Sequence, residues 1–254
     1  RICLVIDDLD ATRDQYVERY GDEVVVFDKR VARKATDSGD NFATLGSVVY
    51  ARNVAHDIAR SLGVDHFVEL DDDYKQYKFR FDAAYNYKPK QLYCLDTVFD
   101  ALVDFLEATQ ADVVSIAQGG DFIGGSQGSF AEIVRMRRKT MNVFVCATAR
   151  PFKFLGKLND DVNTYVVGGT RGRRLFSTNQ VCVEQMPTQS NAGGLTELYL
   201  DVGTYVKSFY SVMFNPSSVK VVQSSNRLHH RIDWKSTTPK ILRETTRLDG
   251  SSAE

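Results

Sequence analysis

The alternation of short apolar strands with amphipathic helices is the feature that most limits how this chain can fold. Apolar runs rich in β-branched residues predict strands at 2–7, 23–28, 65–70, 111–117 and 141–147. Between them, apolar side chains recur at helical spacing over 47–62 and 91–109. Ser47 is suited to cap the first of these helices, and Gly63 to end it. This order favours an α/β fold with a mixed, mainly parallel sheet flanked by helices.

The second half of the chain is less regular. Residues 166–176 predict a hairpin with basic residues near its turn, and residues 195–214 predict a helix weakened by a glycine. The glycine-rich stretch 118–130 is interpreted as a mobile loop. Because no repeat or linker divides the chain, we expect a single domain over residues 1–243 with an elaborated C-terminal half, followed by a flexible tail at 244–254.

Three consecutive aspartates, Asp71, Asp72 and Asp73, follow the third predicted strand. Adjacent like charges repel one another, so the triplet either lies in a solvated loop or shares a divalent cation. Ligands gather at the carboxyl ends of strands in parallel sheets, which favours the cation. On extended backbone, Asp71 and Asp73 point to the same side while Asp72 points away. The pair therefore predicts a site for Mg²⁺ or Mn²⁺ bound together with a diphosphate.

A second acidic motif competes with this one near the amino end. Asp8, Asp10 and Thr12 have the D-x-D-x-T spacing of haloacid-dehalogenase-type phosphatases, in which the first aspartate is a nucleophile. That chemistry also needs a lysine and a later acidic pair after strands, and no matching lysine is evident. Helix capping or loop solvation by Asp8 and Asp10 is the simpler interpretation, and a phosphatase stays an alternative.

A third acidic motif consists of Asp160 and Asp161, preceded by Asn159. One carboxylate could act as a general base on an incoming hydroxyl group while its neighbour orients the helix start. The pair could equally open a helix, with its acids near the positive end of the helix dipole. The adjacent residues His229 and His230 stand on a predicted strand and face opposite sides, so only one of them is expected to reach a metal ion.

Composition indicates the cellular environment of the protein and the kinds of partner that it binds. Four widely spaced cysteines without a CxxC motif or a Cys/His cluster predict free thiols in a reducing cytoplasm. No apolar run approaches the roughly 20 residues of a membrane span, so we expect no membrane partner. The net charge is −1, yet residues 133–174 hold ten bases and only two acids. This local excess indicates either a phosphate-bearing partner or a solvated basic surface.

The segment ARNVAHDIARSLGVDHFVELDDDY (51–74), together with Asn159-Asp160-Asp161 and the late histidine pair, resembles a glycosyltransferase of the GT-A type. The resemblance implies a Rossmann-type fold. It also implies that Arg52, Asp71, Asp72 and Asp73 bind the nucleotide sugar, and that Asp71, Asp73 and His229 or His230 hold Mn²⁺ or Mg²⁺. Asp160 and Asp161 are similar to the x-Glu-Asp motif of these enzymes, with Asp160 where glutamate is usual and Asp161 as the catalytic base.

Residues 193–221 and 227–242 resemble the TET-associated glycosyltransferases, which are encoded mainly by bacteriophages. This resemblance implies transfer of a hexose from a UDP-sugar to a 5-hydroxymethylpyrimidine, such as 5-hydroxymethylcytosine, in phage DNA. The hydroxymethyl group would come from a TET-like dioxygenase, and the modification would hide the DNA from restriction in the host cytoplasm. Direct displacement would invert the anomeric carbon. A polysaccharide or another non-DNA acceptor is the main alternative, and a binding module without turnover is a weaker one.

Overall fold

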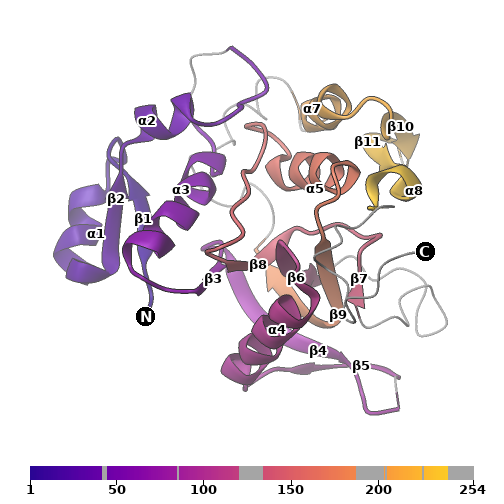
Figure 1. Ribbon diagram of the computed structural model, residues 1–254, viewed down its shortest axis with the longest axis horizontal. Helices are drawn as coiled ribbons and strands as arrows, with labels where there is room; N and C mark the ends of the chain where they lie inside the picture. The colour runs from indigo at the N-terminus through magenta and orange to yellow at the C-terminus, as the bar shows by residue number, and fades with distance from the viewer. Residues whose placement is uncertain are drawn as a thin grey trace, which may run out of the picture.

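The computed structural model describes residues 1–41, 45–84, 86–119, 134–186, 203, 205–224 and 226–239. The protein has a mixed α/β architecture in which helices cover a central sheet and two smaller sheets flank it (Figure 1). The strands are β1 Leu4–Asp7, β2 Val24–Phe27, β3 His66–Glu69, β4 Tyr74–Phe81, β5 Tyr87–Gln91, β6 Val113–Gln118, β7 Val134–Arg135, β8 Asn142–Ala147, β9 Leu175–Gln185, β10 Val219–Ser224 and β11 Arg227–Ile232. The helices are α1 Arg13–Tyr20, α2 Lys29–Lys34, α3 Val49–Ser61, α4 Leu95–Thr109, α5 Asp160–Thr170, α7 Val206–Phe214 and α8 Trp234–Thr237, with a 3₁₀ turn at Gly21–Glu23.

The central sheet has the strand order β3-β8-β6-β9-β4-β5, and β7 also pairs with β9. Among its described pairings only β6 and β9 are parallel, so the expectation of a mainly parallel sheet is wrong. Parallel neighbours need a crossover connection, usually a helix. Here neither α3 nor α4 forms such a crossover. Helix α3 links the separate parallel pair β1–β2 to β3, and α4 links β5 to β6, which are not neighbours in the sheet.

The core lies on both faces of the central strands. Alternate residues of β8 face opposite sides, so Phe144 and Cys146 join one buried cluster while Val143 and Val145 join the other. The first cluster includes side chains of α3 and α5, and the second includes side chains of α4. Burial on both faces explains why β8, NVFVCA, is apolar at every position after Asn142. The predicted flanking of the sheet by helices is confirmed.

Helix α3 begins and ends within two residues of its predicted bounds, but its N-cap is Val48, not Ser47. Ser47 Oγ accepts a hydrogen bond from Val49 N at 3.3 Å and donates one to Lys157 O at 2.9 Å. Gly63 follows the helix with a φ of +64°, a conformation that glycine adopts without steric cost. Ser47 therefore links the start of α3 to the loop that precedes α5.

The predicted hairpin at 166–176 is wrong, because Val166–Thr170 belong to α5 and β9 begins only at Leu175. Gly169 serves close packing instead of a turn, because a Cβ atom there would lie 1.8 Å from Thr237 O of α8. Gly172, with a φ of +87°, lies in the turn that follows α5. The predicted helix over 195–214 is not continuous, and its first part, 195–202, lies outside the described residues. Gly203 has a φ of +82°, and α7 starts after it.

Several other expectations can be placed. All four cysteines are free, as predicted, and Cys146 and Cys182 are buried. None of the helices in the described ranges combines the length and apolar character that a bilayer crossing needs. Most of the glycine-rich loop 118–130 and the whole tail 244–254 lie outside the described residues. The domain boundaries and the cytoplasmic location therefore stay predictions.

Candidate functional site

Arg52 joins the two acidic segments that the sequence analysis singled out. Its Nη1 donates to Asp160 Oδ2 at 2.6 Å, and its Nη2 donates to both carboxylate oxygens of Asp71 at 2.9 and 3.0 Å. The guanidinium also lies over the rings of Phe144 and Phe154, at 5.2 and 5.4 Å from their centroids. Two segments almost ninety residues apart in the sequence thus meet at one side chain of α3, which is 10 % exposed.

The aspartate triplet lies in the turn between β3 and β4, not on extended backbone. Asp71 faces Arg52, Asp72 is exposed, and Asp73 Oδ1 accepts a hydrogen bond from Gln185 Nε2 at 3.2 Å. Burial raises the pKa of Asp73, and the charges of Asp71 and Asp72 add to this effect. The structure therefore brings Asp71 and Asp73 into electrostatic contact while giving each a different hydrogen-bond partner.

Helix α5 begins at the Asn-Asp-Asp motif. Asn159 precedes it with a left-handed φ of +57°, and Asp160 and Asp161 occupy the first turn. Burial and, to a smaller extent, the neighbouring charge of Asp160 raise the pKa of Asp161 to about 6. Burial also raises the pKa of Asp160, although Arg52 offsets part of that effect. The pair can thus provide one carboxylate fixed by an ion pair and one that titrates near neutrality.

Glu69, the last residue of β3, is a member of this cluster that the sequence analysis missed. Both of its carboxylate oxygens are buried and have no hydrogen-bond partner among the described residues. Burial, with a smaller contribution from the charges of Asp71 and Asp160, raises the pKa of Glu69 to about 8, although Arg52 opposes the shift. The alternation of β3 could have placed Glu69 and Asp71 on the same side, but it gave no sign that Glu69 is buried.

Asn53 is a second residue that the sequence analysis missed. Its Nδ2 donates to Phe154 O at 3.0 Å and to Thr36 Oγ1 at 3.1 Å, while its Oδ1 accepts from Phe154 N at 2.7 Å. These bonds fix the backbone of Phe154, whose ring lies beneath Arg52. Asn53 therefore positions one wall of the site from the helical turn that also carries Arg52.

The adjacent histidines separate as strand alternation requires. His230 Nδ1 lies 3.2 Å from Asn159 Nδ2, next to the acidic start of α5, and burial lowers the pKa of its imidazole to about 4. His229 is exposed on the opposite face of β11. Of the two residues, only His230 contacts the Asn-Asp-Asp motif, through Asn159.

Asp8 and Asp10 have local structural partners. Asp8 Oδ1 accepts from Lys29 N at 2.8 Å, and Asp10 Oδ1 accepts from Thr12 N and Thr12 Oγ1 at 2.7 and 2.6 Å. These are the bonds of turns and helix starts. They support the structural interpretation of this motif over a phosphatase site.

The basic segment 133–174 is largely engaged within the protein. Arg150, Lys157 and Arg173 form ion pairs at 2.8, 2.7 and 2.7 Å, and Lys153 and Arg174 donate to backbone carbonyl groups. The charge excess of this segment therefore does not by itself indicate a surface for a phosphate-bearing partner.

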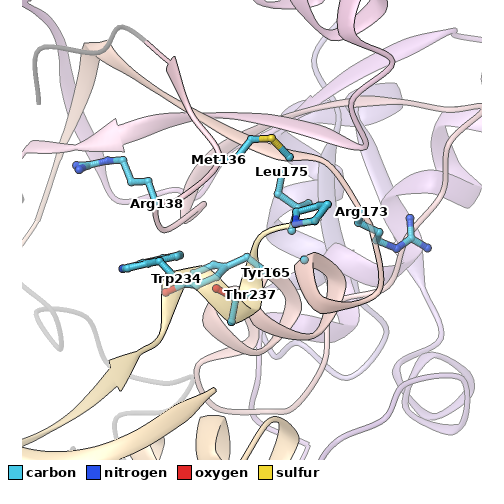
Figure 2. A pocket seen from close by; sticks show the side chains of 9 residues that line it. Met136, Arg138, Tyr165, Arg173, Leu175, Trp234 and Thr237 are labelled. Atoms are coloured by element: carbon cyan, nitrogen blue, oxygen red, sulfur yellow. The ribbon is translucent and has the colours of Figure 1, made fainter. Parts of the chain in front are cut away.

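Two small cavities border α5. One of about 10 Å³, near the smallest volume that holds a water molecule, is lined by Asp161, Thr140, Thr164 and aliphatic or aromatic side chains. The other is of similar size and is lined by Tyr165 and Trp234, whose rings stack at 5.5 Å, with Arg138 and Arg173 at its two sides (Figure 2). Neither has room for a sugar or a base. In the described ranges, no three His, Cys, Asp or Glu side chains are arranged as a metal cluster.

Comparison with known proteins identifies the family. The family model of the TET-associated glycosyltransferases matches residues 1–194, more than half of the 254 residues. The match includes Arg52, the aspartate triplet and Asp160-Asp161. It ends before most of residues 193–221 and all of 227–242, so the resemblance expected for those stretches stays a prediction. No curated protein and no solved structure shows significant similarity to the chain. The chain therefore belongs to the TET-associated glycosyltransferase family.

Proposed function

We propose that this glycosyltransferase moves a hexose from a UDP-sugar to the hydroxymethyl group of a 5-hydroxymethylpyrimidine in DNA, with Mn²⁺ or Mg²⁺ at the donor site. The observation that carries the proposal is the bridge from Asp71 through Arg52 to Asp160. It supports a shared site for the donor-binding and base-bearing segments that the GT-A resemblance implies. The family's association with TET enzymes supports a hydroxymethylated base as the acceptor.

The charge of the cluster supports the divalent cation. Glu69, Asp71, Asp160 and Asp161 act electrostatically on one another around a single guanidinium. Carboxylate oxygens are the ligands that Mg²⁺ and Mn²⁺ prefer, and the two oxygens of Glu69 are buried without a partner. Asp71 and Asp73 would hold the cation, with His230 as the candidate nitrogen ligand. When bound, the cation supplies Lewis-acid stabilisation of the departing diphosphate.

The chain's own residues have distinct roles in this proposal. Arg52 holds Asp71 and Asp160 together and places positive charge beside the donor phosphates. Asp161 removes the proton from the acceptor hydroxyl group, since a carboxylate with a pKa of about 6 is ionised at neutral pH yet basic enough to accept a proton. The hydroxyl oxygen then attacks the anomeric carbon directly, and the sugar is transferred with inversion.

The proposal is tested by incubating the protein with a panel of UDP-sugars, Mn²⁺ and DNA that contains 5-hydroxymethylcytosine. Sugar should appear on the modified DNA and not on unmodified DNA of the same sequence. Transfer to a polysaccharide but not to DNA would show that the acceptor is a polysaccharide. Phosphomonoester turnover that depends on Asp8, without sugar transfer, would overturn the proposal.

Two substitutions test the residue roles. Asp161→Asn should lower kcat by at least 100-fold with UDP binding unchanged, because it removes the base and keeps the shape of the side chain. Asp73→Asn should weaken Mn²⁺-dependent UDP binding. In the wild type, kcat/KM should rise as the pH increases through about 6. Full activity in Asp161→Asn would show that another group accepts the proton.

A further inference from the structure

The hairpin β10–β11 carries a row of basic side chains on one face. Its register pairs Lys220 with Arg231 and Val222 with His229. Residues two apart on a strand share a face, so Arg227, His229 and Arg231 lie on the same side as Lys220. All four side chains are exposed, and together they form the basic face of the hairpin.

The other face of the hairpin belongs to the protein interior. Val219 is buried in the core cluster that contains α5, and Ile232 packs against that cluster. Both strands contact α7, and His230 reaches Asn159 beside the acidic start of α5. The hairpin thus has one face toward the proposed site and the basic face directed away from it.

A solvated surface would account for scattered charges, but the arrangement here has a cost. Lys220 and Arg231 stand directly opposite one another, and like charges in that position destabilise a strand pair. None of Lys220, Arg227 and Arg231 takes part in an ion pair or a side-chain hydrogen bond among the described residues. In this they differ from much of the segment 133–174, whose bases are engaged internally. A polyanion on the basic face would relieve the repulsion.

We propose that the basic face binds the phosphate backbone of the duplex DNA acceptor. This inference rests on the proposed function, because it locates the acceptor of that reaction. A two-stranded ribbon is narrow enough to lie along or within the major groove, and Lys and Arg contacts to phosphate position a protein without reading the sequence. The opposite face of the same strands contacts Asn159 through His230, so DNA held here would be separated from the start of α5 by the thickness of the hairpin.

The test compares two variants with the same loss of charge. One is Lys220→Gln/Arg227→Gln/Arg231→Gln on the basic face. The other is Arg19→Gln/Arg30→Gln/Lys34→Gln, on exposed positions of α1 and α2 on the opposite side of the molecule (Figure 1). Binding of a labelled duplex that contains 5-hydroxymethylcytosine is measured between 50 and 200 mM salt, and binding of UDP with Mn²⁺ reports an intact donor site.

The basic-face variant should bind the duplex at least 10-fold more weakly at 50 mM salt. The slope of log K against log salt should become shallower by about 3, roughly one unit for each lost phosphate contact. The α1–α2 variant should stay within about twofold of the wild type. The double variant Arg227→Lys/Arg231→Lys should also retain binding, because it keeps the charges.

The outcomes separate the two proposals. If the wild type binds UDP and Mn²⁺ but no DNA, the DNA acceptor of the proposed function fails. If the wild type binds DNA and the basic-face variant matches the α1–α2 variant in affinity and slope, this inference fails while the proposed function stands. Equal binding of the wild type to phosphatidylserine vesicles, lost in the same variant, would assign the basic face to a membrane and overturn the inference.

Discussion

Arg52 is the residue on which the geometry of the site depends most directly. It forms ion pairs with Asp71 and Asp160, whose side chains are 26 % and 10 % exposed. Removal of one partner of a buried ion pair costs about 3–5 kcal/mol, because it leaves the other charge unpaired. Arg52→Met should therefore lower the free energy of unfolding by about that amount, toward the lower end since Asp71 is partly solvated, as measured by urea denaturation.

The same helix offers a matched control. Arg60 pairs with Asp57 at 2.7 Å, but both side chains are more than half exposed. An exposed pair of this kind contributes at most about 1 kcal/mol, so Arg60→Met should have little effect. Equal losses in Arg52→Met and Arg60→Met would contradict the view that Arg52 holds the acidic segments together.

Glu69 predicts an unusual dependence of stability on pH. Its pKa of about 8 in the folded state lies above its ordinary value of 4.5. Between these values the folded protein binds more protons than the unfolded chain, so its stability falls as the pH rises, by up to about 1.4 kcal/mol per pH unit. In metal-free buffer, Glu69→Gln should remove this contribution. Its free energy of unfolding should therefore fall less between pH 5 and pH 8 than that of the wild type. If the free energies of unfolding of the two proteins change equally from pH 5 to pH 8, Glu69 is not a buried group that titrates in this range.

At the scale of elements, the contact between α5 and α8 depends on a glycine. A Cβ atom at Gly169 would meet the backbone oxygen of Thr237 at 1.8 Å, whereas one at Gly168 would meet only side-chain atoms of Arg173 and Leu175, at 3.3 Å or more. Gly169→Ala should destabilise the protein by about 1–3 kcal/mol through overpacking, despite the better helix propensity of alanine. Gly168→Ala should be neutral or slightly stabilising. Thermal unfolding of both variants measures the difference, and a stabilised Gly169→Ala would show that α8 is not held against α5.

The same glycine shows where sequence reasoning succeeds and where it stops. Local signals placed α3 between Ser47 and Gly63, since caps and periodicity act within a few residues. They could not distinguish a turn glycine from a packing glycine at 169, because the reason lies on α8, far along the chain. Strand direction failed for a similar reason: helical connections were visible, but which strands become neighbours depends on long-range contacts. Glu69 and Asn53 were missed because burial of a polar side chain leaves no local pattern.

At the scale of the whole molecule, β3, the turn after it and α5 concentrate negative charge around Arg52 of α3. Glu69, Asp71, Asp160 and Asp161 surround one guanidinium, and burial opposes the ionisation of three of them. Folding therefore brings together charges that the unfolded chain keeps apart. A ligand that supplies positive charge to this cluster should favour the folded state over the unfolded chain.

Manganese should therefore stabilise the whole protein, and UDP should increase the effect. A ligand at 100 times its dissociation constant adds about 2.7 kcal/mol to the free energy of unfolding, which for a chain of this length raises Tm by roughly 5–10 °C. Asp73→Asn should lose most of this shift, because it removes a proposed ligand and leaves the Arg52 bridge intact. His230→Ala should lose part of it, whereas His229→Ala should behave like the wild type, since His229 lies on the opposite face of β11. Each shift in Tm is measured by differential scanning calorimetry in calcium-free buffer with and without Mn²⁺. If Mn²⁺ raised the Tm of Asp73→Asn as much as that of the wild type, the cation would bind elsewhere. The carboxylates around Arg52 would then be neutralised in another way, such as by the protons that burial favours on Glu69 and Asp161.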